Sequence, residues 1–268
     1  MRRARGRRTR SLLPGALALA ALIAIPVRTR AAPGPEGAAP GAAADRAPAA
    51  VCARACPECE PEDGAGLDLA CAAQALACRS EQTLCEAKLA VYHAHMEELA
   101  AGVELSLLPA TYRRVLGRFF PRLDLASVRF GWSDRQPPDN AITDCDRIYF
   151  ARSDFVERLR RGKLRAATDW LWLLHELRHA EQCVALGGRD AYAVRWLDEL
   201  GLAFLADADL ATLHDRIPLE DDADERAKRV FAELSRCCLV ADGGIDPEAG
   251  RDVASPPPAG AARSPESR

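Results

Sequence analysis

The sequence predicts an α+β protein that is mostly helical, with a small antiparallel sheet and a cysteine-rich region ahead of it. Three observations lead to this class. Residues 166–186 carry apolar side chains at a helical period, residues 128–132 and 146–150 alternate apolar with polar side chains as strands do, and six cysteines cluster within residues 51–85. With 268 residues, 49% of them hydrophobic, the chain is long enough to bury a core.

The N-terminal segment is typical of an export signal. Residues 1–30 contain eight arginines and no acidic residue, and the run from Leu12 to Val27 is apolar. Such a segment engages the membrane export machinery and is then removed, so we expect the protein in the periplasm or outside the cell. The apolar run is short for a membrane span and has Pro14 and Pro26 near its ends; an uncleaved signal would instead leave the protein anchored in the membrane.

The rest of the chain divides into four parts. The composition predicts a flexible linker at residues 31–50 and a disordered tail at residues 241–268. Between them we expect a cysteine-rich unit at residues 51–85 and the main domain at residues 86–240. Without residues 1–30, 28 basic and 39 acidic side chains remain, which gives a net charge of −11. A body this acidic argues against binding to nucleic acids or anionic membranes, because phosphate contacts need clustered Lys and Arg.

The ten cysteines of an exported chain predict disulfides rather than free thiols. Within residues 51–85 the last three cysteines recur every seven residues, which places them on one stripe of a helix. With the loop at residues 61–66, this pattern predicts a helical hairpin held together by disulfides. The expected bridges are Cys59–Cys71 and Cys52–Cys78.

The two adjacent cysteines near the C-terminus, Cys237 and Cys238, are expected to bind separate partners. A bond between neighbouring cysteines is strained, and this strain argues against a bridge between the two. Cys56 and Cys85 are the candidate partners.

The main domain is expected to hold six helices and two strands. A short second helix stops at Pro121, and the two strands, residues 128–132 and 146–150, are expected to pair antiparallel. The central helix is the most apolar one, as a buried helix should be, and it ends at Gly187-Gly188. Pro218 opens the last helix, whose first turn is acidic and so suits the helix dipole. The helices are expected at residues 86–108, 111–120, 154–162, 166–186, 190–208 and 217–240.

The central helix carries the motif His175-Glu176-Leu177-Arg178-His179. Residues four positions apart share a helix face, so the imidazoles of His175 and His179 can bind one metal ion. Two imidazoles at this spacing, with a glutamate that can reach a metal-bound water, form the arrangement used in hydrolytic zinc sites. The motif therefore predicts one Zn²⁺ ion held by both histidines, with Glu176 as the general base.

Further residues are needed to complete such a site. A catalytic zinc ion usually has three protein ligands and one water. The candidates for the third ligand are Glu199, on the helix after the motif, and Glu220, in the first turn of the last helix. Tyr192 and His214 are candidates for stabilising an oxyanion, and His214 precedes the helix that carries Glu220.

The stretch from about residue 128 to residue 232 resembles the zincin-like metallopeptidase domains of bacteria, including small domains found with extracellular contractile injection systems. The matching residues surround the motif and recur on both sides of it. They are Thr143-Asp144-Cys145, Ile148-Tyr149-Phe150, Leu174 to Cys183, Gly187-Gly188-Arg189, Tyr192-Ala193, Trp196, Pro218-Leu219-Glu220 and Ala223-Asp224. The resemblance implies a compact zincin-like domain built around a central helix that bears the motif.

The resemblance also implies roles for residues outside the motif. Many zincins carry a ligand glutamate three residues before an Ala-Asp pair, which implies that Glu220 binds zinc and that Asp224 orients a ligand histidine. Glu199 resembles the thermolysin-like spacing and is the alternative. In a zincin the edge strand runs beside the active-site helix, which implies a Cys145–Cys183 bridge between the two. The alternative for Cys183 is a role as a further metal ligand.

Together these features predict an exported zinc-dependent metallopeptidase that hydrolyses peptide bonds of a protein or peptide substrate. One alternative is a binding or structural module that keeps the zincin fold without catalysis. The other is a zinc hydrolase of the cell-wall amidase type, which would use the same metal and base on a different substrate.

Overall fold

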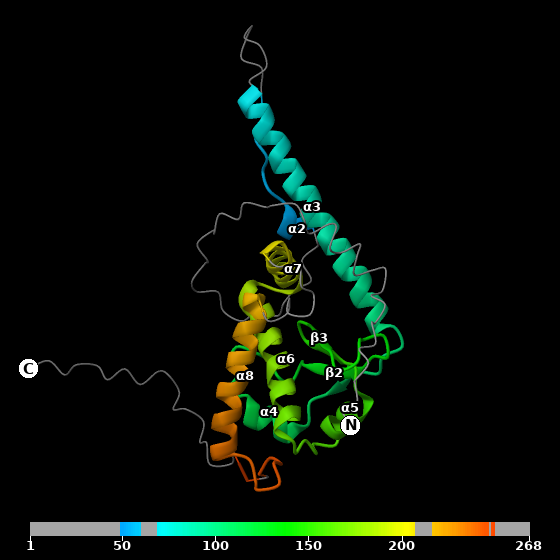
Figure 1. The fold of residues 1–268 in the computed structure, drawn as a ribbon, viewed down its shortest axis with the longest axis vertical. Coiled ribbons are helices and arrows are strands. Elements are labelled where there is room, and N and C mark those ends of the chain that lie inside the picture. The colour runs from blue at the N-terminus through cyan, green and yellow to red at the C-terminus, as the bar shows by residue number, and fades with distance from the viewer. Residues whose placement is uncertain (1–48, 60–68, 207–215, 247, 250–268) are drawn as a thin grey trace, which may run out of the picture.

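The computed structural model describes residues 49–59, 69–206, 216–246 and 248–249, and Figure 1 shows their arrangement. These residues form a mixed α+β protein, mostly helical, with one four-stranded sheet, which confirms the predicted class at this level. In chain order the elements are α2 (Ala49–Cys52), α3 (Leu69–Ala100), β1 (Ser106–Leu107), α4 (Ala110–Leu116), β2 (Arg129–Trp132), β3 (Ala141–Asp144), β4 (Arg147–Phe150), α5 (Ser153–Arg160), α6 (Ala167–Leu186), α7 (Arg189–Ala206) and α8 (Pro218–Cys237).

Several parts of the sequence prediction fall on residues that the structure does not describe. They are the export signal at residues 1–30, nearly all of the linker, most of the C-terminal tail, and His214.

The sheet is mixed, and the prediction of an antiparallel sheet is wrong. Its strand order is β1-β2-β4-β3, and β2 pairs with β4 in parallel, whereas the β1–β2 and β3–β4 pairs are antiparallel. The reason is β3, whose sequence Ala-Ile-Thr-Asp has too weak a strand pattern to be recognised. Because β3 reverses the chain between the two predicted strands, those strands run in the same direction.

The register of the β3–β4 hairpin determines where each side chain of β3 points. Thr143 pairs with Ile148, which belongs to the core beneath α6, and Ile142 pairs with Tyr149, which packs with α3 and α7. Side chains alternate along a strand, so Thr143 faces α6 and Asp144 faces α3 and α7. A shift of one residue would exchange these two environments.

The helix α6 lies at the centre of the main core, between the sheet and α8 (Figure 1). Burial of each large apolar side chain here stabilises the fold by roughly 1.5–3 kcal/mol relative to exposure. The helix ends where sequence analysis placed its end, because Gly187 adopts the left-handed conformation with φ of 96°. Its fully buried apolar side chains are Trp170, Leu173, Leu174, Leu177 and Ala180.

The cysteine-rich region is a helix with an extended strap, and the predicted helical hairpin is wrong. Of the residues that the structure describes before α3, only α2 is helical, and residues 53–59 carry no regular secondary structure. In the second half, α3 runs without interruption from Leu69 to Ala100, so the domain boundary expected after residue 85 falls inside one helix. Three disulfides fasten the strap to α3: Cys52–Cys85, Cys56–Cys78 and Cys59–Cys71.

The spacing of the cysteines explains this ladder of disulfides. Seven residues of a helix rise about 10.5 Å, and three or four extended residues span roughly 10–13 Å. The distances between successive cysteines are therefore nearly equal in an extended strap and in α3, so the cysteines can pair one by one. In two helical arms these distances would differ, because the cysteine spacings differ. The predicted Cys59–Cys71 bridge is confirmed, and the predicted Cys52–Cys78 bridge is wrong.

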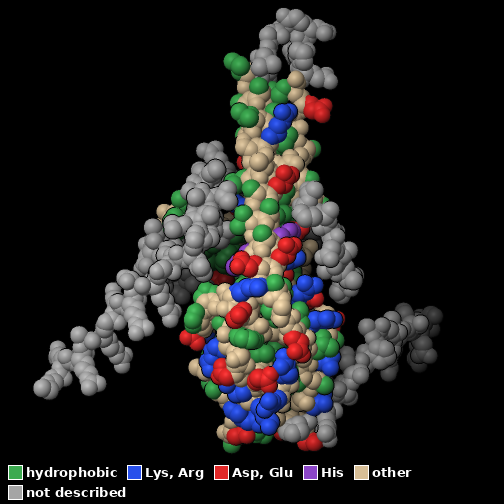
Figure 2. Space-filling view, turned by 90° about the vertical axis from the view of Figure 1, so that its right-hand side faces the viewer, with side chains coloured by type: hydrophobic (Ala, Val, Ile, Leu, Met, Phe, Trp, Pro, Cys, Tyr) green, Lys and Arg blue, Asp and Glu red, His purple; other side chains and the backbone are tan. Residues whose placement is uncertain are grey.

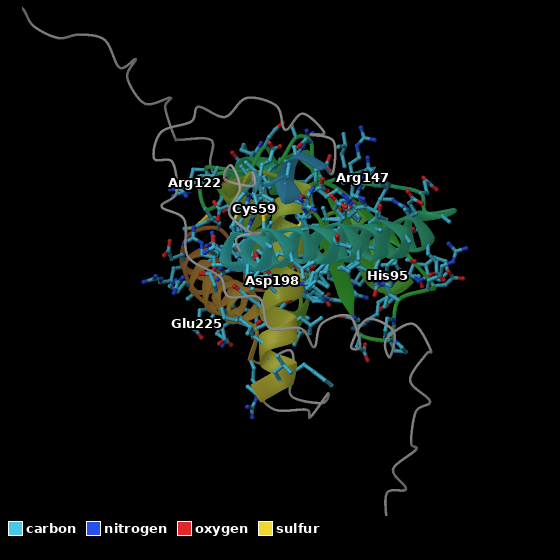
Figure 3. All side chains as sticks on the ribbon, turned by 90° about the horizontal axis from the view of Figure 1, so that it is seen from above. Cys59, His95, Arg122, Arg147, Asp198 and Glu225 are labelled. Carbon is cyan, nitrogen blue, oxygen red and sulfur yellow. A yellow bond between two sulfur atoms is a disulfide. The ribbon has the colours of Figure 1, made fainter. Side chains whose placement is uncertain are left out.

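The stapled half of α3 projects from the body as a stalk, which Figures 1 and 2 show from two sides. The other half of α3 crosses α7, as the view from above in Figure 3 shows. Polar contacts fix this crossing: Lys88 Nζ lies 2.6 Å from Asp198 Oδ1, and the Tyr92 hydroxyl donates to Asp144 Oδ1 at 3.0 Å. The Nε of Arg189, in the first turn of α7, donates to the same Asp144 oxygen at 2.6 Å.

The remaining four cysteines form two disulfides. The Cys145–Cys183 bridge joins the β3–β4 turn to α6, as the resemblance implied. Cys237 and Cys238 bind each other, so the prediction of separate partners is wrong. The candidate partners are bonded elsewhere: Cys56 to Cys78 and Cys85 to Cys52. Five disulfides are consistent with an oxidising, exported location. Within the described part of the chain, no helix combines the length and the apolar character that a membrane span requires.

Removal of the Cys145–Cys183 bridge is expected to lower the free energy of unfolding by about 2–4 kcal/mol, because the bridge closes a loop with a sequence separation of 38 residues. Urea denaturation of the Cys145→Ser/Cys183→Ser variant measures this loss. The Cys59→Ser/Cys71→Ser variant, altered at the far end of the stalk, is the matched control and should leave unfolding of the core unchanged. Equal stability of the first variant and the wild type would contradict the prediction.

Candidate metal centre

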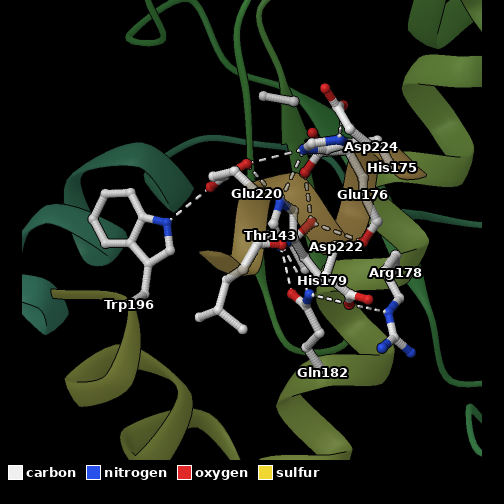
Figure 4. Close-up of polar contacts among 12 residues, drawn as sticks. Thr143, His175, Glu176, Arg178, His179, Gln182, Trp196, Glu220, Asp222 and Asp224 are labelled. Atoms are coloured by element: carbon white, nitrogen blue, oxygen red, sulfur yellow. Dashed lines mark hydrogen bonds and ion pairs between the residues drawn. The ribbon is translucent and has the colours of Figure 1, made fainter. Parts of the chain in front are cut away.

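The helices α6 and α8 bring three metal-binding side chains together. The ring atoms His175 Nε2 and His179 Nε2, one helical turn apart, lie 2.9 Å from each other. The carboxylate oxygen Glu220 Oε2, from the first turn of α8, lies 3.1 Å from the first and 3.0 Å from the second (Figure 4). His175, His179 and Glu220 therefore form a buried group that could hold a metal ion.

The outer nitrogens of both imidazoles are held by oxygen atoms. His175 Nδ1 lies 2.8 Å from Asp224 Oδ1, and His179 Nδ1 lies 2.8 Å from Gln182 Oε1. The orientation of the Gln182 amide is fixed, because its Nε2 donates to the carbonyl of Leu219 at 2.9 Å and to a carboxylate oxygen of Asp222 at 2.8 Å. Each imidazole therefore donates its Nδ1–H outward and directs the lone pair of Nε2 inward.

The third member of the group is held in the same way. Trp196 Nε1, from α7, donates to the outer oxygen Glu220 Oε1 at 2.8 Å, which leaves Oε2 facing the two imidazoles. Three acceptor atoms thus converge at 2.9–3.1 Å from one another, an arrangement that is repulsive unless a cation lies among them. In a tetrahedral zinc site, bonds of about 2.0–2.1 Å place ligand atoms roughly 3.3 Å apart, so this group fits such an ion.

The electrostatics of the centre favour positive charge. Burial lowers the pKa of His175, but the hydrogen bond to Glu220 and the negative charges of Glu176, Glu220 and Asp224 outweigh it and raise the pKa to about 9. The carboxylates around the imidazoles therefore retain a cation at neutral pH, either a proton or a metal ion in its place.

The choice between the two candidate third ligands depends on Glu199. This buried residue of α7 lies outside the group, and its Oε2 accepts a hydrogen bond from the backbone N–H of Leu219 at 2.9 Å. It thereby caps the N-terminus of α8, which has no cap from its own Ile217. Glu199 contacts the helix that presents Glu220 and is not part of the group of three, which leaves Glu220 as the candidate for the third ligand.

Glu176 directs one of its carboxylate oxygens toward the sheet. Its side chain is buried, and its Oε2 accepts a hydrogen bond from the hydroxyl of Thr143 on β3 at 2.7 Å. The residue lies next to His175 on α6, so one helix presents both a metal-binding atom and a carboxylate. This is the pairing that water activation needs.

Three further residues that the sequence singled out, Tyr192, Asp224 and Cys183, lie around the metal-binding group and are not part of it. Tyr192 is buried with its ring edge-on to His179, and burial and the nearby Glu220 raise the pKa of its phenol well above 10, so it is a neutral group beside the centre. Asp224 is half-exposed and contacts His175, as the resemblance implied. Cys183 is not a metal ligand, because its sulfur is bonded to Cys145.

Sequence reasoning assigned no role to Thr143 or Trp196, although both belong to stretches that carry the resemblance. Each comes from a separate element, β3 or α7, and no spacing in the sequence connects it to the motif. Arg178, inside the motif, binds Asp222 at 2.7 Å and Glu181 at 2.6 Å, and so supports Gln182 through the shared Asp222.

Comparison of the chain with protein-family models, with curated proteins and with solved structures finds no match.

Replacement of Gln182 by Leu is expected to weaken divalent-metal binding about 10–100-fold, because the Nδ1–H of His179 loses its acceptor and the ring loses its orientation. Competition with a chromophoric chelator measures the affinity. Gln74→Leu, on the exposed stalk, is the matched control, and an unchanged affinity in Gln182→Leu would show that this hydrogen bond does not position the ring.

Proposed function

We propose that this protein is an exported zinc-dependent hydrolase with a zincin-like domain and that it cleaves peptide bonds. One observation carries the proposal: the inner atoms of His175, His179 and Glu220 converge while their outer atoms are each held by a separate partner. Two imidazoles and one carboxylate are the ligand set of many catalytic zinc sites. The five disulfides support a site of action outside the cytoplasm.

In this proposal each residue of the centre has a defined role. His175, His179 and Glu220 hold the metal, and the metal, when bound, lowers the pKa of a water molecule to about 7 and polarises the carbonyl of the substrate. Glu176 accepts the proton of that water and passes it to the nitrogen of the departing amine. Asp224, Gln182 and Trp196 keep the ligands in the orientation that metal binding requires. They act through the ligands and not on the substrate itself.

A peptide substrate is supported by the position of β3. It is an edge strand, with no further strand beyond it in the described part of the sheet, and Thr143 in its middle contacts Glu176. An edge strand offers unpaired backbone groups to which an extended peptide can add as a further strand. A peptide bound there would lie next to the general base.

The test is to measure zinc content and hydrolysis on the same preparation of oxidised protein. The proposal predicts one zinc ion per chain and cleavage of members of a peptide library, with loss of both on chelation. Peptidoglycan fragments form the second substrate set, and cleavage of those alone would support the amidase alternative. A protein that binds no zinc would refute the proposal.

One observation favours the alternative of a non-catalytic module. The side chains of the metal-binding group are almost closed to solvent, with exposed fractions of 12% for His175, 6% for His179 and 7% for Glu220. The structure has a hollow of about 290 Å³, but it lies at the C-terminal end of α8, whereas Glu220 is in the first turn of that helix. Phe231 and Val240 help to line this hollow. If the metal is structural, its removal lowers the melting temperature, and Glu176→Gln equals the wild type in every hydrolysis assay.

A further inference from the structure

The buried hydroxyl of Thr143 is the polar contact that connects the sheet to Glu176. Thr143 and Glu176 are 3% and 4% exposed, and the Thr143 Oγ1 lies 2.7 Å from Glu176 Oε2 and 3.2 Å from the backbone carbonyl of Glu176 (Figure 4). A hydroxyl has one hydrogen to donate, and the shorter contact indicates that the carboxylate receives it. A hydrogen bond to an ionised carboxylate is stronger than one between neutral groups.

A second connection holds the same two elements together. Cys145, two residues after Thr143, is bonded to Cys183, seven residues after Glu176. Residues seven apart lie on the same stripe of a helix, and Cys145 lies in the tight turn that directly follows β3. The Thr143–Glu176 hydrogen bond therefore joins β3 to α6, and the disulfide joins the end of the same strand, at its turn, to the same helix.

We infer that Thr143 is a positioning residue that holds the carboxylate of Glu176 in place for proton transfer, an inference that rests on the proposed function. The hydroxyl fixes Oε2, and the other carboxylate oxygen, Oε1, is left to take the proton of the attacking water. A glutamate side chain has three rotatable bonds, and without this contact it would be free to leave the productive orientation. A displacement of about 1 Å at a reacting group can cost roughly 100-fold in rate.

The kinetic test compares two substitutions at position 143 in the zinc-loaded, oxidised protein. Thr143→Val keeps the shape of the side chain without the hydroxyl, and we expect kcat to fall about 10–100-fold while KM changes less than twofold. Thr143→Ser keeps the hydroxyl and should restore most of kcat. Zinc content should stay at one ion per chain in both variants. Thr168→Val, on the exposed start of α6, is the matched control.

A second measurement does not depend on activity. Melting temperatures are compared among the wild type, Thr143→Val, Glu176→Ala and the double variant. If the hydroxyl binds the carboxylate, Thr143→Val lowers the melting temperature by about 2–4 °C in the wild-type background and by much less in the Glu176→Ala background. Additive effects would mean that the two side chains do not interact.

The outcomes separate this inference from the proposed function. A wild-type protein that binds zinc but cleaves neither peptides nor peptidoglycan fragments overturns the proposed function, and the positioning role with it. An active wild type whose kcat is unchanged in Thr143→Val, or whose melting temperatures are additive, overturns the positioning role alone. A loss of kcat that Thr143→Ser fails to restore overturns it as well.

Discussion

Glu176→Gln is expected to lower kcat/KM for peptide hydrolysis by about 10²–10⁴-fold while zinc content stays at one ion per chain. The amide cannot accept a proton from water, so the general base is lost. The substitution keeps the size of the side chain, and the amide oxygen can still accept the hydrogen bond from Thr143, so the buried contact with β3 is retained. The loss should therefore fall on catalysis and leave the fold intact.

The measurement is steady-state hydrolysis of a library-derived peptide, with zinc content and melting temperature determined on the same samples. Glu225→Gln, an exposed position on α8, is the matched control for the chemical change and should equal the wild type. An unchanged rate in Glu176→Gln would exclude this residue as the base and favour the structural role of the metal.

Removal of a ligand is the second large effect. Glu220→Gln and His179→Ala are each expected to weaken zinc binding by more than 100-fold, since even the loss of a partner behind a ligand costs 10–100-fold. The metal would join α6 to α8, and it binds the folded chain with its ligands already assembled. At a free zinc concentration of 100 times Kd, binding should stabilise the wild type by about 2.7 kcal/mol.

This second prediction is tested by thermal denaturation with and without zinc in a buffered metal solution. The wild type and the Glu225→Gln control should gain several degrees on addition of zinc, and both ligand variants should gain almost nothing. A zinc-dependent gain of the same size in Glu220→Gln would show that Glu220 is not a ligand.

Much of the centre follows from the sequence because its decisive spacing is local. His175 and His179 are four residues apart on one helix, and the pitch of a helix places them on one face wherever that helix packs. Gly187 and Pro218 are local signals too: the first predicts the end of α6 and the second the start of α8, and the structure has both. Spacing alone left the third ligand open, because Glu199 and Glu220 both lie on later helices whose packing no spacing determines, and only the resemblance favoured Glu220.

The errors in the sequence prediction have one physical cause. Three predictions were wrong: the antiparallel sheet, the helical hairpin and the separate partners of Cys237 and Cys238. Each depends on contacts between segments that are distant in the chain or differ in their local structure. The short strand β3 shows this clearly: its four residues form a strand through pairing with β4 and not through their own pattern.

The sequence by itself determined the mostly helical class, the helix of the motif and the pair of imidazoles, since each depends on a period of a few residues. The tertiary structure alone decided that Glu220 joins those imidazoles while Glu199 caps α8, and that Thr143 reaches Glu176. The physical reason is that α6, α7, α8 and β3 each supply one side of the centre. Their relative positions are set by burial of the core and by the Cys145–Cys183 bridge rather than by any local rule.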